Sequence, residues 1–92
     1  MKAAAEVNLK RVTLELGGKS PLVVFNDADV DLAADVAHRA AFANAGQCCV
    51  AGTRTYVQSG IYDKFVQKAA EIAKKRTVGN PWEDVQQGPQ VN

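Results

Sequence analysis

The stretch that decides the fold runs from residue 22 to residue 46 and reads LVVFNDADVDLAADVAHRAAFANAG. It opens with four consecutive apolar residues, Leu22–Phe25, which is typical of a strand covered on both faces, as in a parallel sheet. The polar residues Asn26–Asp29 that follow favour a turn. The stretch therefore predicts a buried strand that ends in a sharp change of direction.

The second half of the stretch has the periodicity of a helix. From Val30 to about Asn44 the apolar residues recur at helical spacing, and many of them are alanines. Asp29 or Asp31 can cap this helix, because a carboxylate accepts hydrogen bonds from the free N–H groups at its start. Gly46 stands where a left-handed residue commonly ends a helix.

Downstream of this unit the sequence predicts a further strand and a further helix. Thr53–Gln58 is predicted to be a strand, and residues 60–76 are predicted to be a helix that Ser59 caps. The buried stripe of that helix is expected to hold Ile61, Phe65, Ala69, Ile72 and Ala73. The residues from Asn80 onward are rich in Gln, Gly and Pro and indicate a loop.

Upstream, Arg11–Leu16 carries β-branched and apolar residues and is predicted to be a strand ended by Gly17-Gly18. The expected order is β-β-α-β-α, an α/β fold. Two or three strands do not make a self-sufficient doubly wound sheet, so apolar sheet and helix faces are expected to stay uncovered. A fragment of a larger domain, or a chain with an obligate partner, is the expected architecture.

Composition limits the class of protein. The chain has 92 residues, which is one domain at most and allows only a marginal core. A net charge of +1 gives no electrostatic footprint for nucleic acid or an anionic membrane. No apolar run has the length of a membrane span or of a secretory signal core. Two cysteines are too few for a disulfide framework, so a reducing intracellular setting is expected.

The adjacent pair Cys48 and Cys49 lies between the predicted helix and the strand after it. A thiolate in such a loop is a strong nucleophile, whereas the alternative is a small buried hydrophobic residue. A strained vicinal disulfide or a thiol-redox role are weaker alternatives. Metal binding is not expected, because the cysteine spacing does not fit and the lone imidazole, His38, lies in mid-helix as a packing or surface residue.

Glu15 is an unusual residue in an apolar strand, because a buried charge is costly. It either ends the strand in solvent or in a salt bridge, or it is a partly buried carboxylate that acts as a general base. Gly17-Gly18 can let a flat ligand approach the backbone closely. The chain holds no G-x-G-x-x-G pattern and no P-loop.

Two of these segments together resemble a known family. Glu15-Leu16-Gly17-Gly18-Lys19-Ser20-Pro21 resembles the glutamate signature of the aldehyde dehydrogenase superfamily, and Phe42-Ala43-Asn44-Ala45-Gly46-Gln47-Cys48-Cys49 resembles its cysteine signature, F-x-x-x-G-Q-x-C. The segment between them and the closing Gly88–Asn92 are also similar to that family. The resemblance covers nearly the whole chain and is nearest to the NAD-dependent enzymes of the class 1/class 2 type.

The resemblance implies roles for individual residues. Cys49 matches the catalytic nucleophile, with Cys48 as its neighbour, and Glu15 matches the catalytic glutamate that activates water. Leu16 and Gly17 match the cofactor-binding positions where the family's chain passes the nicotinamide of NAD, with NADP as the alternative cofactor. Phe42 and Asn44 fall near the substrate pocket. A side-chain amide from an upstream segment is the family's second oxyanion donor.

The resemblance also implies what kind of chain this is. Residues 1–92 match part of the nucleophile-bearing catalytic domain, a β-β-α-β-α segment of a doubly wound fold, without a cofactor-binding domain. The parent reaction is oxidation of an aldehyde to a carboxylic acid, in a homo-oligomer that is cytoplasmic or in the mitochondrial matrix. Neither nucleic acid nor a membrane is an expected partner. The isolated chain is expected to be inactive, and a truncated module that associates with full-length subunits is the alternative.

Overall fold

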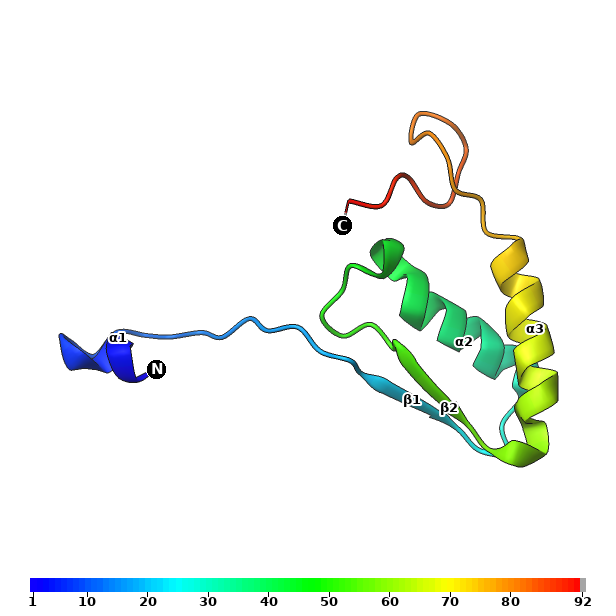
Figure 1. Ribbon diagram of the computed structural model, residues 1–92, viewed down its shortest axis with the longest axis horizontal. Helices are drawn as coiled ribbons and strands as arrows, with labels where there is room; N and C mark the ends of the chain where they lie inside the picture. Colours follow the sequence, from blue (N-terminus) through cyan, green and yellow to red (C-terminus); the bar gives the residue numbers. More distant parts are fainter. Residues whose placement is uncertain (92) are drawn as a thin grey trace.

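The computed structural model describes residues 1–91, and Asn92, the last residue of the closing Gly88–Asn92 stretch, lies outside the described residues. The elements in chain order are α1 (Lys2–Glu6), β1 (Pro21–Val24), α2 (Val30–Phe42), η1 (Ala43–Gly46), β2 (Arg54–Val57), η2 (Ser59–Ile61) and α3 (Tyr62–Lys74). Figure 1 shows a body made of β1, β2, α2 and α3, with the N-terminal segment extending away from it. The expected α/β class is confirmed.

The sheet of the described residues has two parallel strands, β1 and β2, joined by α2. Pro21 pairs with Arg54 and Val24 with Val57. Pro21 is tolerated because it is the first residue of its strand, where a missing N–H costs the ladder least. The predicted strands at Leu22–Phe25 and Thr53–Gln58 are thus confirmed to within a residue or so at each end.

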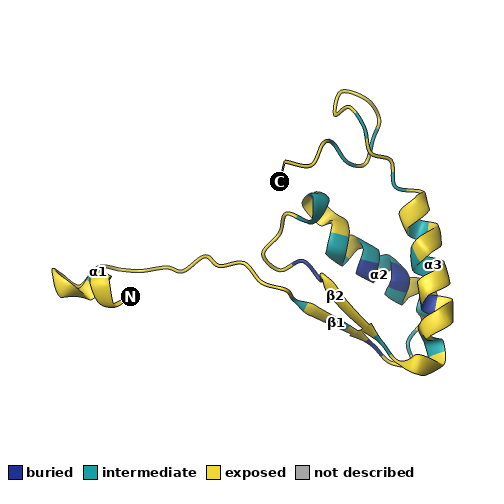
Figure 2. Ribbon diagram, viewed as in Figure 1, coloured by how far each residue is buried: buried dark blue, intermediate teal, exposed yellow. Residues whose placement is uncertain are grey.

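Both long helices cover the same face of the sheet, and the core lies between them and the strands (Figure 2). Its buried members are Val24, Ala34, Ala37 and Phe65. Alternate side chains of β1 point the other way, so Val23 is 55% exposed and Phe25 60% exposed. The strand predicted to be covered on both faces is therefore covered by this chain on one face alone.

The start of α2 confirms one of the two predicted caps. Asp29 Oδ1 accepts hydrogen bonds from the backbone N–H groups of Asp31 at 2.9 Å and Leu32 at 3.1 Å. The helix ends at Phe42, slightly before the predicted end near Asn44.

The predicted cap of the last helix is wrong. Ser59 begins η2, and its carbonyl, not its hydroxyl, accepts a hydrogen bond from the Tyr62 N–H. The 3-10 turn thus places Ser59 ahead of the free N–H groups of α3, which begins after Ile61 without a side-chain cap. In the predicted buried stripe of this helix Phe65 is buried, Ile61, Ala69 and Ile72 are half-buried, and Ala73 is exposed.

The predicted strand at Arg11–Leu16 is wrong. Residues 9–20 form no helix or strand, and they run as an extended arm that leads from α1 to β1. A strand exists only through pairing, and no described segment lies beside this one to accept its hydrogen bonds. The arm raises the radius of gyration to 18.4 Å, against about 12 Å for a compact chain of this length.

Candidate active site

The loop that carries the two cysteines begins with a left-handed turn. Asn44, Ala45 and Gly46 have φ angles of 52°, 58° and 77°. The turn is closed at both ends: the Gln47 N–H donates to the Asn44 carbonyl at 3.0 Å, and Asn44 Nδ2 donates to the Gln47 carbonyl at 2.9 Å. Gly46 confirms the predicted left-handed position. At this turn the chain changes direction after the end of α2 and continues to Cys48.

Cys49 occupies the tip of the next turn. The Cys48 carbonyl accepts a hydrogen bond from the Ala51 N–H at 3.1 Å, which leaves Cys49 and Val50 as the two central residues. Both cysteines are exposed, and neither forms a disulfide. The interpretation of these residues as buried small hydrophobic side chains is therefore wrong for this chain, where both side chains are exposed.

The residues after Cys49 anchor this turn to the body. Ala51 and Gly52 are buried, and the Gly52 N–H donates to the Ala40 carbonyl of α2 at 3.0 Å. A Cβ atom on Gly52 would lie 3.1 Å from the Ala40 Cβ, so only glycine fits without displacing the helix. The contacts of Ala51 and Gly52 with the body therefore hold the exposed turn in place.

The arm, which carries the glutamate signature, passes beside the loop that carries the cysteines. A Cβ atom on Gly18 would lie 3.4 Å from the Cys49 carbonyl oxygen, so the two backbones are in contact. Arg54 of β2 fixes the base of the arm, because its Nε and Nη2 donate to the Lys19 carbonyl at 2.9 Å and 2.6 Å. Since an extended chain advances about 3.3 Å per residue, the Glu15 backbone lies within roughly 10 Å of this contact.

Glu15 itself is exposed. Within residues 1–91 its carboxylate has no ion pair and no hydrogen bond, so it faces solvent in this chain. Leu16 is also exposed, and a Cβ atom on Gly17 would have nothing within 4 Å. The space beside Gly17 is open to a flat ring, which suits the role expected of it.

One residue of this region was not anticipated. Arg76 follows α3, and its Nη2 donates to the Phe42 carbonyl at 3.0 Å while its Nε donates to Gln87 Oε1 at 2.8 Å. In the sequence it is one of several basic residues near the end of a helix, where positive charge suits the helix dipole. Nothing in that local pattern distinguishes Arg76 from its lysine neighbours, because its partners come from distant segments.

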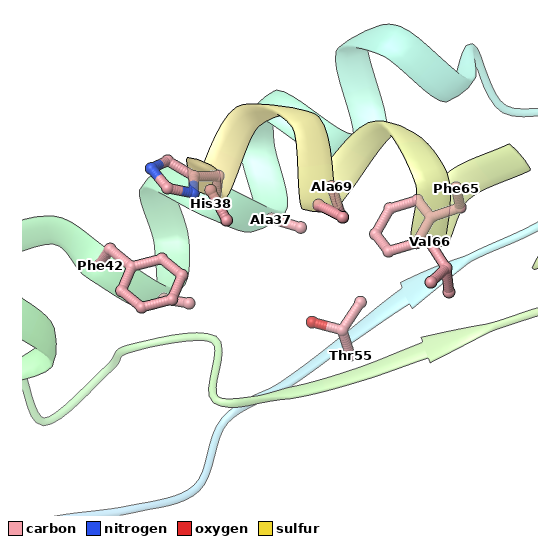
Figure 3. Close-up of a pocket in the computed structure, with 10 residues that line it drawn as sticks. Ala37, His38, Phe42, Thr55, Phe65, Val66 and Ala69 are labelled. Carbon is pink, nitrogen blue, oxygen red and sulfur yellow. The ribbon is translucent and has the colours of Figure 1, made fainter. Parts of the chain in front are cut away.

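An apolar groove lies between α2, α3 and β2, and Phe42 is one of its lining residues (Figure 3). It has a volume of about 380 Å³, and the side chains shown lining it include Ala37, His38, Phe42, Thr55, Phe65, Val66 and Ala69. His38 packs its ring against Phe42 with 4.9 Å between centroids, which confirms it as a packing residue. Neither cysteine lines this groove.

Residues 1–91 contain no group of three His, Cys, Asp or Glu side chains that could hold a metal ion. No helix among them has the length and apolar character needed to cross a membrane.

Comparison with known proteins gives a consistent result. The family model described as the aldehyde dehydrogenase family matches residues 1–92. Aldehyde dehydrogenase 9 of Polyandrocarpa misakiensis is 60% identical over 100% of this chain and 41% of its own length. The crystal structure of an aldehyde dehydrogenase from Brucella melitensis biovar abortus 2308 matches with a TM-score of 0.91 and 47% identity, over 99% of this chain and 19% of that one.

A second solved structure, an NADP-dependent enzyme of E. coli, matches with a TM-score of 0.91 and 40% identity, over 99% of this chain and 19% of that one. The chain thus spans less than half of the length of the curated relative and about a fifth of each solved structure. The TM-scores show that its conformation, including the arm, is the conformation of a segment within those longer chains.

Proposed function

Because the chain belongs to the aldehyde dehydrogenase family, we propose that it carries the nucleophile and the water-activating carboxylate of an enzyme that oxidises an aldehyde to a carboxylic acid. The observation that carries the proposal is the contact between Gly18 and the Cys49 carbonyl, which brings the two motif segments together. Cys49 is the nucleophile, and Glu15 is the general base.

The covalent step begins at Cys49. Its thiolate attacks the aldehyde carbon, and the carbonyl electron pair moves to oxygen to give a tetrahedral thiohemiacetal oxyanion. The Cys49 backbone N–H meets no acceptor within residues 1–91, so it is free to donate to this oxyanion. By family analogy, a side-chain amide supplies the second donor.

Loss of hydride from the former aldehyde carbon leaves a thioester on Cys49. Glu15 then takes a proton from water, and the hydroxide attacks the thioester carbon to release the carboxylic acid and the thiolate. In this chain the Glu15 carboxylate faces solvent, so water reaches it directly.

A nicotinamide cofactor, when bound, supplies the acceptor for that hydride. Gly17 fits the nicotinamide end, because the space beside its backbone is open, and Leu16 adjoins it. NAD is the proposed cofactor, and the similarity to an NADP-dependent enzyme makes NADP the alternative.

The setting follows from the nucleophile. A catalytic thiol must stay reduced, and both cysteines are free and exposed, so we place the enzyme in a reducing compartment, the cytoplasm or the mitochondrial matrix. The proposed partners are an aldehyde substrate and further copies of the subunit, with no role for nucleic acid or a membrane.

The test compares three variants of a full-length enzyme that contains this segment. Cys49→Ala is expected to lower kcat by at least about 10³-fold, because the covalent route is lost, whereas Cys48→Ala keeps most of the activity. Glu15→Gln is expected to slow steady-state turnover by roughly 10²- to 10⁴-fold, while a first-turnover burst of reduced cofactor remains. Equal losses in the two cysteine variants, or loss of the burst in Glu15→Gln, would overturn these roles.

The isolated 92-residue chain is expected to be inactive, since it supplies only the nicotinamide end of a cofactor site. Purified chain is mixed with an aldehyde and NAD, and absorbance at the wavelength of reduced nicotinamide is followed. No rise above the rate given by Cys49→Ala is expected. A sustained rise that Cys49→Ala abolishes would contradict this expectation.

A second candidate function is a non-catalytic module that associates with full-length subunits. The observation that favours it is the row of apolar side chains on the open face of the sheet, Val23, Phe25 and Tyr56, all more than half exposed. Immobilised chain is incubated with a purified full-length subunit of the family. Capture that Val23→Asp abolishes would support this function, and no capture would exclude it.

A further inference from the structure

Arg76 joins three segments that are far apart in the sequence. It lies just past α3, and its guanidinium donates to the Phe42 carbonyl at the end of α2 and to the side chain of Gln87 in the C-terminal tail. Its Cζ also lies 5.6 Å from the centre of the Phe42 ring. A planar fork with donors in fixed directions is suited to hold two acceptors at once.

Phe42 is the last residue of α2, and the loop that carries the cysteines begins directly after it. The last carbonyls of a helix lack partners within the helix, so the end of α2 is free to fray unless another group binds it. Beyond Phe42 the chain enters η1, where Asn44 and Ala45 adopt φ angles that non-glycine residues rarely accept. A group that binds the Phe42 carbonyl therefore fixes the point from which this turn departs.

The other partner of Arg76 is itself held in place. The Gln87 N–H donates to the Thr77 carbonyl at 3.1 Å, and the Gln87 carbonyl accepts from the Gly79 N–H at 3.0 Å. Thr77 is tied a second time, because its hydroxyl accepts from the Gln86 N–H at 3.0 Å. Gln87 is therefore held in place by the backbone around it. Because Arg76 donates to both Gln87 and the Phe42 carbonyl, it restrains the end of α2 relative to the C-terminal tail.

We propose that Arg76 is a positioning residue that fixes the carboxyl end of α2 and, through η1, the place of Cys49. Its importance to the reaction depends on the proposed function, but the contacts that define the role do not. A basic residue that acted only on the dipole of α3 needs no fork and no bond to another helix. The bond to the Phe42 carbonyl is the feature that separates the two roles.

The test measures hydrogen exchange of single backbone amides in the 92-residue chain by NMR. The informative amides are those of Gln47, which bonds the Asn44 carbonyl, and Ala51, which closes the turn around Cys49. Arg76→Gln is expected to speed exchange at both by about five- to tenfold, because a charge-assisted bond to the end of α2 is lost. Amides in the middle of α2 and α3 are expected to change by less than about twofold.

Two further variants serve as controls. Arg39→Gln removes a cation from the exposed surface of α2, the helix whose end Arg76 binds. Arg39 pairs there with Asp35 at 2.7 Å, and its loss is expected to leave the exchange rates of the Gln47 and Ala51 amides unchanged. Arg76→Lys keeps the charge but replaces the two donor nitrogens of the planar guanidinium with one ammonium nitrogen, so it is expected to give an intermediate effect. A shift at Gln47 and Ala51 with this order of variants supports the proposal.

Three results would overturn it. Unchanged exchange at Gln47 and Ala51 in Arg76→Gln would show that the hydrogen bonds within the loop are enough to keep it ordered. A uniform rise across α2, α3 and the sheet would show a general loss of stability. Full protection in Arg76→Lys would show that charge alone suffices. The proposed function is judged separately by Cys49→Ala, so each idea can fail without the other.

Discussion

At the scale of single residues, the site depends on backbone conformations that are uncommon for the side chains that adopt them. Asparagine tolerates the left-handed region because its side chain can bond locally, and Asn44 does so through the Gln47 carbonyl. Ala45 has no such compensation at φ 58°. The strain lies three residues before Cys48, in the turn that leads to the proposed nucleophile.

Ala45→Gly is expected to raise the free energy of unfolding by about 0.5–1 kcal/mol, since glycine adopts positive φ without a steric penalty. Ala43→Gly is the matched control, because Ala43 has an ordinary φ of −55°. There the added chain entropy is expected to lower stability by about 0.5–1 kcal/mol. Urea unfolding measures both, and a loss of stability in Ala45→Gly would contradict the strain argument.

At the scale of elements, α2 and α3 are joined by an ion pair between their side chains. Lys68 Nζ of α3 lies 2.6 Å from Asp31 Oδ1 of α2. The hydrogen bond to Asp31, followed by its charge, raises the pKa of Lys68 above its usual 10.5. Because the folded pKa is the higher one, the contribution is complete below about pH 10 and is lost as pH rises through the folded value.

Lys68→Met is expected to be less stable than the natural chain at pH 7, with a difference that closes above about pH 10.5. The difference in thermal unfolding midpoint is measured from pH 7 to pH 11.5. Lys64→Met is the control, because Lys64 lies one turn earlier on α3 and has no ion pair among the described residues. A difference that disappears below pH 9, or persists at pH 11.5, would contradict the assignment.

At the scale of the whole molecule, the body has more apolar surface than it can bury. Within residues 1–91 no large side chain is completely buried, and the core contains two alanines among its four buried members. The open sheet face and the extended arm are both surfaces that other parts of the longer relatives can cover. The shape of this chain is therefore that of a part fitted to its surroundings.

Concentration-dependent association of the isolated chain is the expected consequence, because exposed apolar patches of this kind favour contact between molecules. Sedimentation velocity is measured over a hundredfold range of concentration. Val23→Asp is expected to reduce the association, whereas Val91→Asp, at an equally apolar and more exposed position in the tail, leaves it unchanged. A single monomeric species at every concentration would contradict this expectation.

The sequence by itself determined the elements whose signals are local. The apolar run before Asn26, the capping carboxylate of Asp29 and the glycine at Gly46 predict a strand, a helix and its end, because each acts on neighbours within a few residues. The two signatures likewise predict Glu15 and Cys49 as the catalytic residues.

Tertiary structure alone decided what depends on partners. Arg11–Leu16 has the composition of a strand but pairs with nothing in the described chain, since strand formation requires a neighbour. Arg76 has the local pattern of a helix-end cation, yet it binds Phe42 and Gln87. The contact of Gly18 with the Cys49 carbonyl, which joins the two signatures into one site, exists because the chain folds β1 beside β2.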